Sequence, residues 1–148
     1  PLRACPIPAP ERPWLRRCRA LGVPCTALTL EPAFGSIDTW VPAIDAAVAR
    51  LERCTGGPPI VVAHSMGGLA LRHWYAGQAD AGRLRHAITI GTPHRGTWLA
   101  RWAHARNARQ MRLHSGWLAE LERRELRWAL VSGQGEDRFR AALAAIEG

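Results

Sequence analysis

The sequence contains no lysine, so all 20 of its basic side chains are arginines, against 12 acidic residues. Arginine used in place of lysine, together with abundant alanine, is typical of a GC-rich genome rather than of selection for positive charge. The arginines are spread among alanines in segments with helical character, and no recognised nucleic-acid-binding motif accompanies them. We therefore interpret the formal net charge of +8 as solvated helix faces, and we expect no nucleic-acid partner.

Long apolar runs and metal-binding spacings are also missing. No run approaches the roughly 20 residues that cross a bilayer, and the N-terminal stretch lacks the pattern of a secretory signal, which favours the cytoplasm. The four cysteines form no C-x-x-C pair, and the six histidines include no H-E-x-x-H motif. The sequence thus predicts neither a metal nor a cofactor, in a chain of 148 residues that is long enough to bury a core.

The stretch Pro59–Ala70 carries the strongest local signal. An apolar, β-branched run leads at once into a small-X-Ser-X-small pentapeptide and then into helix-forming residues, which predicts a strand, a sharp turn and a helix with Ser65 at the apex. Such a turn needs small residues two positions before and two after the serine, and these are Ala63 and Gly67, with Gly68 adding room. An ordinary turn with a capping serine is the alternative interpretation.

The order of the predicted elements indicates an α/β fold. Residues 1–12 are rich in proline and are expected to be irregular, whereas 13–148 form the domain. We expect a mainly parallel sheet of about four strands with helices on both faces. The predicted strands are 25–30, 60–63, 86–90 and 126–132. The predicted helices are 13–21, 37–51, 66–77, 98–106, 115–124 and 138–146.

Two motifs in this order resemble one known family. Residues 63–68, Ala-His-Ser-Met-Gly-Gly, resemble the nucleophile elbow of α/β-hydrolases of the lipase and esterase type, and residues 91–97 after the next strand resemble a loop of bacterial triacylglycerol-lipase-like proteins. The resemblance implies a partial α/β-hydrolase fold and hydrolysis of an ester or lipid substrate. It implies that Ser65 is the nucleophile and that the backbone N–H of Met66 stabilises the oxyanion.

Both ends of the chain depart from that family pattern. The order of the triad in this fold is serine, acid, histidine, and the candidate acid is Asp137, which could equally be a favourable charge at a helix N-terminus. No histidine follows Asp137, and no His-Gly pair, the usual start of the second oxyanion segment, exists in the sequence. We therefore expect a truncated or frame-disrupted serine hydrolase with little or no activity.

Other interpretations remain open. His94 could act as the base, although in similar proteins its loop shapes the rim of the site. Residues 97–125 resemble the lid or cap region of lipases, where an apolar face with a basic rim would contact a lipid interface, or would simply pack on the sheet. The chain could also be a non-catalytic binding or scaffold domain, or a basic protein that binds anionic lipid or nucleic acid.

Overall fold

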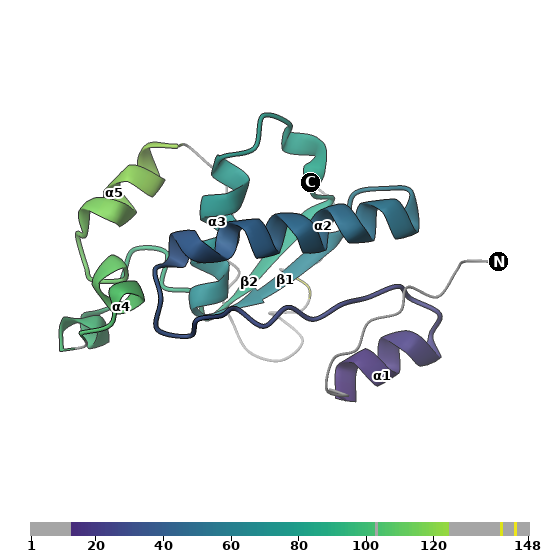
Figure 1. The fold of residues 1–148 in the computed structure, drawn as a ribbon, viewed down its shortest axis with the longest axis horizontal. Coiled ribbons are helices and arrows are strands. Elements are labelled where there is room, and N and C mark those ends of the chain that lie inside the picture. The colour runs from purple at the N-terminus through teal and green to yellow at the C-terminus, as the bar shows by residue number, and fades with distance from the viewer. Residues whose placement is uncertain (1–12, 103, 125–139, 141–143, 145–148) are drawn as a thin grey trace.

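The computed structural model describes residues 13–102, 104–124, 140 and 144 (Figure 1). The helices and strands follow one another in the order α1 (Pro13–Ala20), η1 (Ile37–Trp40), α2 (Val41–Thr55), β1 (Ile60–His64), α3 (Met66–Ala76), η2 (Ala81–Arg83), β2 (His86–Ile90), η3 (Trp98–Arg101), α4 (Arg106–Gln110) and α5 (Gly116–Arg123), where η marks a 3₁₀ helix. The structure therefore tests five of the six predicted helices. The sixth, 138–146, lies almost entirely outside the described residues.

Within the described residues the sheet has two strands, β1 and β2, which run parallel and are connected by α3. Ile60 lies opposite His86, and the register continues to His64 opposite Ile90. The predicted strand 25–30 is wrong, because these residues join no ladder. Apolar, β-branched composition favours an extended segment but does not supply the hydrogen-bonded neighbour that a strand requires. The predicted strand 126–132 lies outside the described residues.

The core lies on one face of the sheet. Val61 and Ala63 of β1 pack on a buried cluster built from η1, α2, α3 and α5, in which Trp40 and Trp74 are the largest fully buried side chains. Figure 1 shows α2 and α3 in front of the two strands. The opposite face carries Ile60, Val62 and Ile90, each more than half exposed. Because the predicted helix 138–146 lies almost entirely outside the described residues, the presence of helices on both faces stays a prediction.

The helix between the predicted strands is close to its predicted position. It begins as the 3₁₀ turn η1 and continues as α2, with Pro42 in the first turn, where its missing N–H removes no hydrogen bond. It ends at Gly56, whose φ of 75° is the left-handed conformation that glycine adopts at low cost. Ile44 and Val48 are buried, as the 3.6-residue spacing predicts.

The predicted helix 98–106 is wrong. The structure has only the four-residue turn η3, followed after a break by the five-residue helix α4. In η3 only Ala100 is buried. Because a helix gains most of its stability from packing its apolar face, an apolar stretch that packs on nothing has little reason to extend beyond one turn.

Candidate active site around Ser65

Ser65 connects the end of β1 to the first residue of α3 and has an unusual backbone conformation. Its φ is 52° and its ψ is −127°. A side chain in this region crowds the backbone, which costs on the order of 1–3 kcal/mol and persists only where the surrounding structure imposes it. The predicted sequence of strand, sharp turn and helix is thus present, and the strain falls on the serine.

The side chain of Ser65 does not cap α3. Its hydroxyl makes no hydrogen bond to the helix that it precedes. Four other helices among the described residues begin with an N-cap residue in the extended conformation whose side-chain oxygen accepts a backbone N–H. These residues are Ser36, Asp80, Thr97 and Ser115. The contrast excludes the interpretation of Ser65 as an ordinary capping serine.

The end of β2 holds the Ser65 backbone in place. The N–H of Ser65 donates to the carbonyl oxygen of Ile90 at 2.8 Å, which extends the pairing of the two strands by one step. The carbonyl oxygen of Ser65 accepts from the Thr92 hydroxyl at 2.9 Å and from the N–H of Gly68 at 3.1 Å. Ile90 and Thr92, which lie outside the turn, therefore fix the strained conformation together with Gly68 inside it.

The tightest steric point is one residue later than the spacing predicts. A Cβ at Gly67 would meet only a methyl group of Leu30, at 3.8 Å, which is ordinary contact. A Cβ at Gly68 would lie within 2.8 Å of three atoms of the Thr92 side chain. The glycine that the turn requires is thus Gly68, because the loop after β2 presses on it, and the steric explanation for Gly67 was wrong.

The half-buried Ser65 lies at the amino end of α3. Met66 is the first residue of α3, and the N–H groups of a first helical turn have no partner within the helix. Their aligned dipoles place partial positive charge at this point. The helix dipole therefore favours an anion formed next to Ser65, and the role of the Met66 N–H in stabilising it stays a prediction.

Among the described residues, which include all six histidines, none donates to or accepts from the Ser65 hydroxyl. The Nε2 atom of His94 lies 3.0 Å from the Thr89 hydroxyl on β2. Burial, followed by the charge of Arg72, lowers the pKa of His94. His73 is bound to Asp38 at 3.1 Å. The candidate acid Asp137 lies outside the described residues, so no triad can be traced among those that the structure describes.

Arg72 of α3 is a further support of the site that sequence reasoning missed. Its guanidinium donates to the carbonyl oxygen of His94 at 3.3 Å and to that of Leu121 in α5 at 3.5 Å. Its Nε atom is buried with no partner among the described residues. Burial lowers the pKa of Arg72, although the side chain remains charged. An arginine in an amphipathic helix is ordinarily solvated, so the sequence carried no signal for this role.

A second polar cluster joins η1, α3, α4 and α5. The carboxylate of Asp38 accepts from Ser36, from Gln110 and from the Trp117 indole at 2.7 Å, besides its bond to His73. Burial raises the pKa of Asp38, but these hydrogen bonds and His73 outweigh it, so the net shift is downward. With its polar partners satisfied, the cluster is a structural connection between helices rather than a second site.

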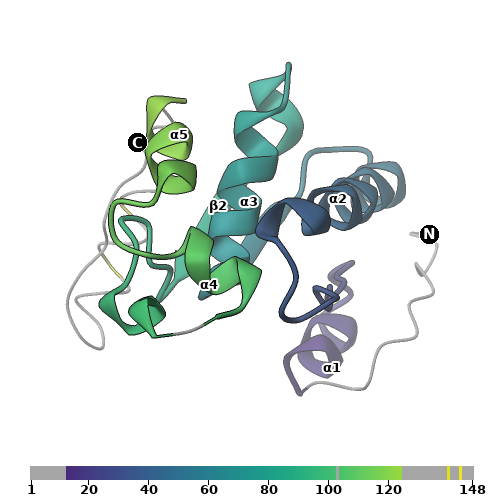
Figure 2. The same ribbon diagram turned by 60° about the vertical axis from the view of Figure 1, so that its left-hand side comes forward.

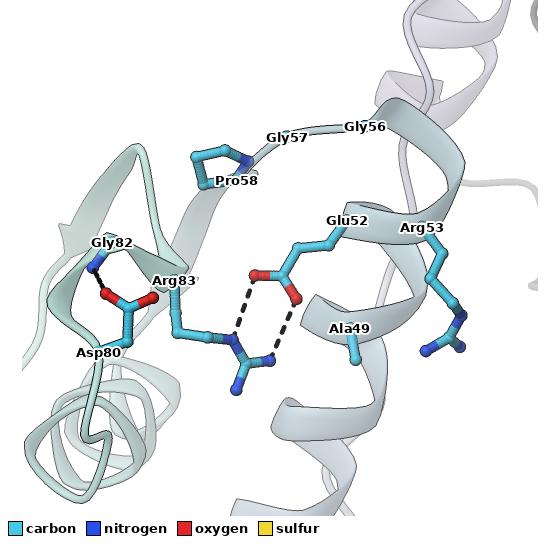
Figure 3. A pocket seen from close by; sticks show the side chains of 9 residues that line it. All are labelled: Ala49, Glu52, Arg53, Gly56, Gly57, Pro58, Asp80, Gly82 and Arg83. Atoms are coloured by element: carbon cyan, nitrogen blue, oxygen red, sulfur yellow. Dashed lines mark hydrogen bonds and ion pairs between the residues drawn. The ribbon is translucent and has the colours of Figure 1, made fainter.

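A cavity of about 470 Å³ lies at the other end of the sheet (Figure 3). Its lining includes Gly56, Gly57 and Pro58, which lead into the amino end of β1. Across it Arg83 forms two hydrogen bonds with Glu52, at 3.1 and 3.3 Å. In parallel α/β sheets, sites lie beyond the carboxyl ends of the strands, where Ser65 is found. We therefore do not regard this cavity as the active site.

The sequence profile of the alpha/beta hydrolase family matches residues 8–146. The chain belongs to the alpha/beta hydrolase family. Among curated proteins, none matches the sequence significantly. One similar solved structure is phospholipase PlaB from Legionella pneumophila, with a TM-score of 0.58 and 18% sequence identity over 80% of this chain. The chain spans 32% of the length of that protein, and at this identity the likeness shows the fold alone.

Other features bear on what the alpha/beta hydrolase chain can bind. Among the described residues, no helix combines the length and apolar character needed to cross a bilayer. In the same part of the chain, no three His, Cys, Asp or Glu side chains gather as metal ligands would. The groups bonded to the Ser65 backbone are instead the Ile90 carbonyl, the Gly68 amide and the Thr92 hydroxyl.

Proposed function

We propose that this chain hydrolyses carboxylic esters of the lipase or carboxylesterase class, with Ser65 as the nucleophile. The observation that carries this proposal is the strained conformation of Ser65, whose hydroxyl neither caps α3 nor bonds to another described residue. A residue held in a conformation that costs on the order of 1–3 kcal/mol, where glycine would relieve the cost, is more readily explained by chemistry than by stability.

The chemistry would be acyl transfer through the serine. The Ser65 oxygen attacks the ester carbonyl, the alcohol leaves, and water then releases the acid from the acyl-enzyme. The N–H of Met66 donates to the negatively charged oxygen of the tetrahedral intermediate, which is the interaction that usually contributes most in acyl transfer. Thr92 and Gly68 act indirectly, since they fix the Ser65 backbone and hence the direction of its hydroxyl.

The described residues by themselves support only low activity, because none of their histidines is bonded to the Ser65 hydroxyl. Loss of a triad member leaves roughly 10³–10⁴-fold acceleration over water, from the oxyanion donors and binding alone. The role of Asp137 as the acid of a triad therefore stays a prediction.

A fluorophosphonate probe tests the proposal directly. The Ser65 oxygen displaces fluoride from phosphorus, so labelling requires a nucleophilic serine but no particular ester. We expect a slow adduct on the peptide that contains Ser65, absent in Ser65→Ala. The matched control is Ser115→Ala, which removes another serine at a helix N-terminus and should keep the label.

The outcomes separate the candidate functions. No adduct after prolonged incubation of the folded protein would contradict the proposal and would favour a non-catalytic binding domain. An adduct that persists in Ser65→Ala would place the reactive serine elsewhere. Where Ser65 is labelled, release of acid from short and long p-nitrophenyl esters then defines the acyl chains that the protein accepts.

A further inference from the structure

The turn η3 presents a group of large apolar side chains to solvent. Trp98, Leu99 and Trp102 are 62%, 73% and 73% exposed, respectively. We call these three residues the η3 patch. Exposed tryptophan at this density is rare on a protein surface that contacts only water. The interpretation that this segment packs on the sheet is therefore wrong.

The backbone of η3 is nevertheless held firmly. The Thr97 side chain accepts the N–H of Leu99, and the N–H of Thr97 donates to the carbonyl oxygen of Met111 at 2.8 Å. Ala100 is buried, and its carbonyl oxygen accepts from Arg112 at 3.3 Å. The exposed patch is thus carried by an anchored turn, and its exposure does not follow from a loose end of the chain.

The charge around the η3 patch has one sign. From Gly91 to Ala119 the chain has five arginines and no acidic residue. Four of these arginines are exposed and form no ion pair with a described residue, namely Arg95, Arg101, Arg106 and Arg109. The guanidinium of Arg101 lies 5.8 Å from the Trp102 ring, so positive charge directly adjoins the apolar surface.

We propose that the η3 patch and its exposed arginines dock this protein on an anionic lipid surface. Tryptophan prefers the headgroup level of a bilayer, where its ring is apolar and its N–H is solvated. Arginines beside it attract anionic headgroups, each contributing about 1 kcal/mol, or about fivefold in binding. A protein partner with an acidic surface would complement the charge of the exposed arginines. Such a partner offers no apolar layer into which three adjacent side chains can insert.

The position of the η3 patch fits such an orientation. In Figures 1 and 2, α4, which follows η3, lies at the end of the molecule toward which β1 and β2 run. Ser65 follows the carboxyl end of β1 at that same end. Docking through η3 would turn the Ser65 side of the sheet toward the membrane, but it requires no reaction at Ser65 and is independent of the proposed function.

Vesicle sedimentation tests the proposal with the full chain. We expect binding to vesicles of phosphatidylcholine with phosphatidylglycerol, and much weaker binding to phosphatidylcholine alone or in high salt. Trp98→Ala with Trp102→Ala should lower the partition coefficient about tenfold or more. Arg101→Gln with Arg106→Gln should lower it roughly 25-fold, and Ser65→Ala should leave it unchanged.

The control variants match these changes elsewhere on the surface. Arg16→Gln with Arg17→Gln alters net charge equally on the exposed face of α1, and Leu21→Ala removes an apolar side chain that is 69% exposed. Both should bind like the unmodified protein. An equal loss in the α1 pair would overturn the proposal in favour of binding through net charge alone.

Three further outcomes would also overturn it. One is the absence of vesicle binding by the unmodified protein. Another is lipid-free self-association that the tryptophan pair abolishes, since the η3 patch would then contact a second copy. The third is salt-sensitive binding to nucleic acid that depends on the same arginines and exceeds vesicle binding. If the double variant Trp98→Ala with Trp102→Ala does not fold, the double variant Arg101→Gln with Arg106→Gln tests the proposal alone, because it removes no buried group.

Discussion

Replacing Gly68 with alanine should destabilise the protein, whereas the same replacement at its neighbour Gly67 should not. Both glycines lie in the first turn of α3, so both variants gain the same preference of alanine for helix, up to about 1 kcal/mol. Only at Gly68 would the new methyl group overlap Thr92. The difference between the two variants therefore isolates the close contact between α3 and the loop after β2.

The expected magnitude follows from the cost of overpacking. Forcing a methyl group into a filled position costs about 1–3 kcal/mol. The free energy of unfolding of Gly68→Ala should therefore be lower than that of Gly67→Ala by this amount. For a domain of this length the difference corresponds to roughly 2–4 °C in melting temperature per kcal/mol. Chemical denaturation followed by the fluorescence of the seven tryptophans measures it directly.

A double-mutant cycle identifies the colliding residue. Thr92→Ala removes two of the three atoms that the new methyl group would meet, so Gly68→Ala should cost less in that background. Displacing Thr92 also disturbs its bond to the Ser65 carbonyl oxygen, and probe labelling should slow in Gly68→Ala but not in Gly67→Ala. Equal stability of the two single variants, or a cycle without coupling, would refute this account of the turn.

Three further expectations concern the supports of the fold and the site. Ser65→Gly should raise the free energy of unfolding by about 1 kcal/mol or more, because glycine adopts a φ of 52° without strain, and a destabilised variant would argue against strain at this residue. Because burial lowers the pKa values of His73 and His94 below 6.5, the unfolded chain binds more protons than the folded chain below that pH. Stability should therefore fall as the pH drops through 6.5. It should fall again below about 4, because Asp38 has a lowered pKa in the folded chain and takes up its proton later than in the unfolded chain. Urea titrations at several pH values measure both steps, and His73→Gln should make the first step smaller. Arg72→Met should weaken protection from hydrogen exchange in residues 91–97 and in α5, which it connects, and unchanged protection there would remove its supporting role.

The elements around Ser65 could be predicted because their signals are local. The β-branched run of β1, the glycines after Ser65 and the alternation in β2 each lie within a few residues, and both strands fall within one residue of the predicted bounds. The helix that ends at Gly56 was predicted for the same reason. In β1 and α2, the preference of the backbone and the burial of one face agree.

The remaining features depend on residues that are distant in sequence. Which glycine is required depends on Thr92, which belongs to a different loop, so spacing alone pointed to Gly67. The segment 25–30 has the composition of a strand but pairs with no strand among the described residues. The segment that begins at Trp98 has the composition of a packed helix, but its large apolar side chains are exposed. Composition reports what a segment prefers, whereas tertiary contacts decide whether that preference is met.

The loop 91–97 connects the two proposals physically. At its start Thr92 donates to the Ser65 carbonyl oxygen, in its middle the carbonyl oxygen of His94 accepts from Arg72, and at its end Thr97 pairs with Met111. With three anchors in seven residues, the loop leaves η3 little freedom to move relative to the Ser65 turn. The orientation in which the η3 patch meets a lipid surface therefore also fixes the direction from which a substrate in that surface would approach Ser65.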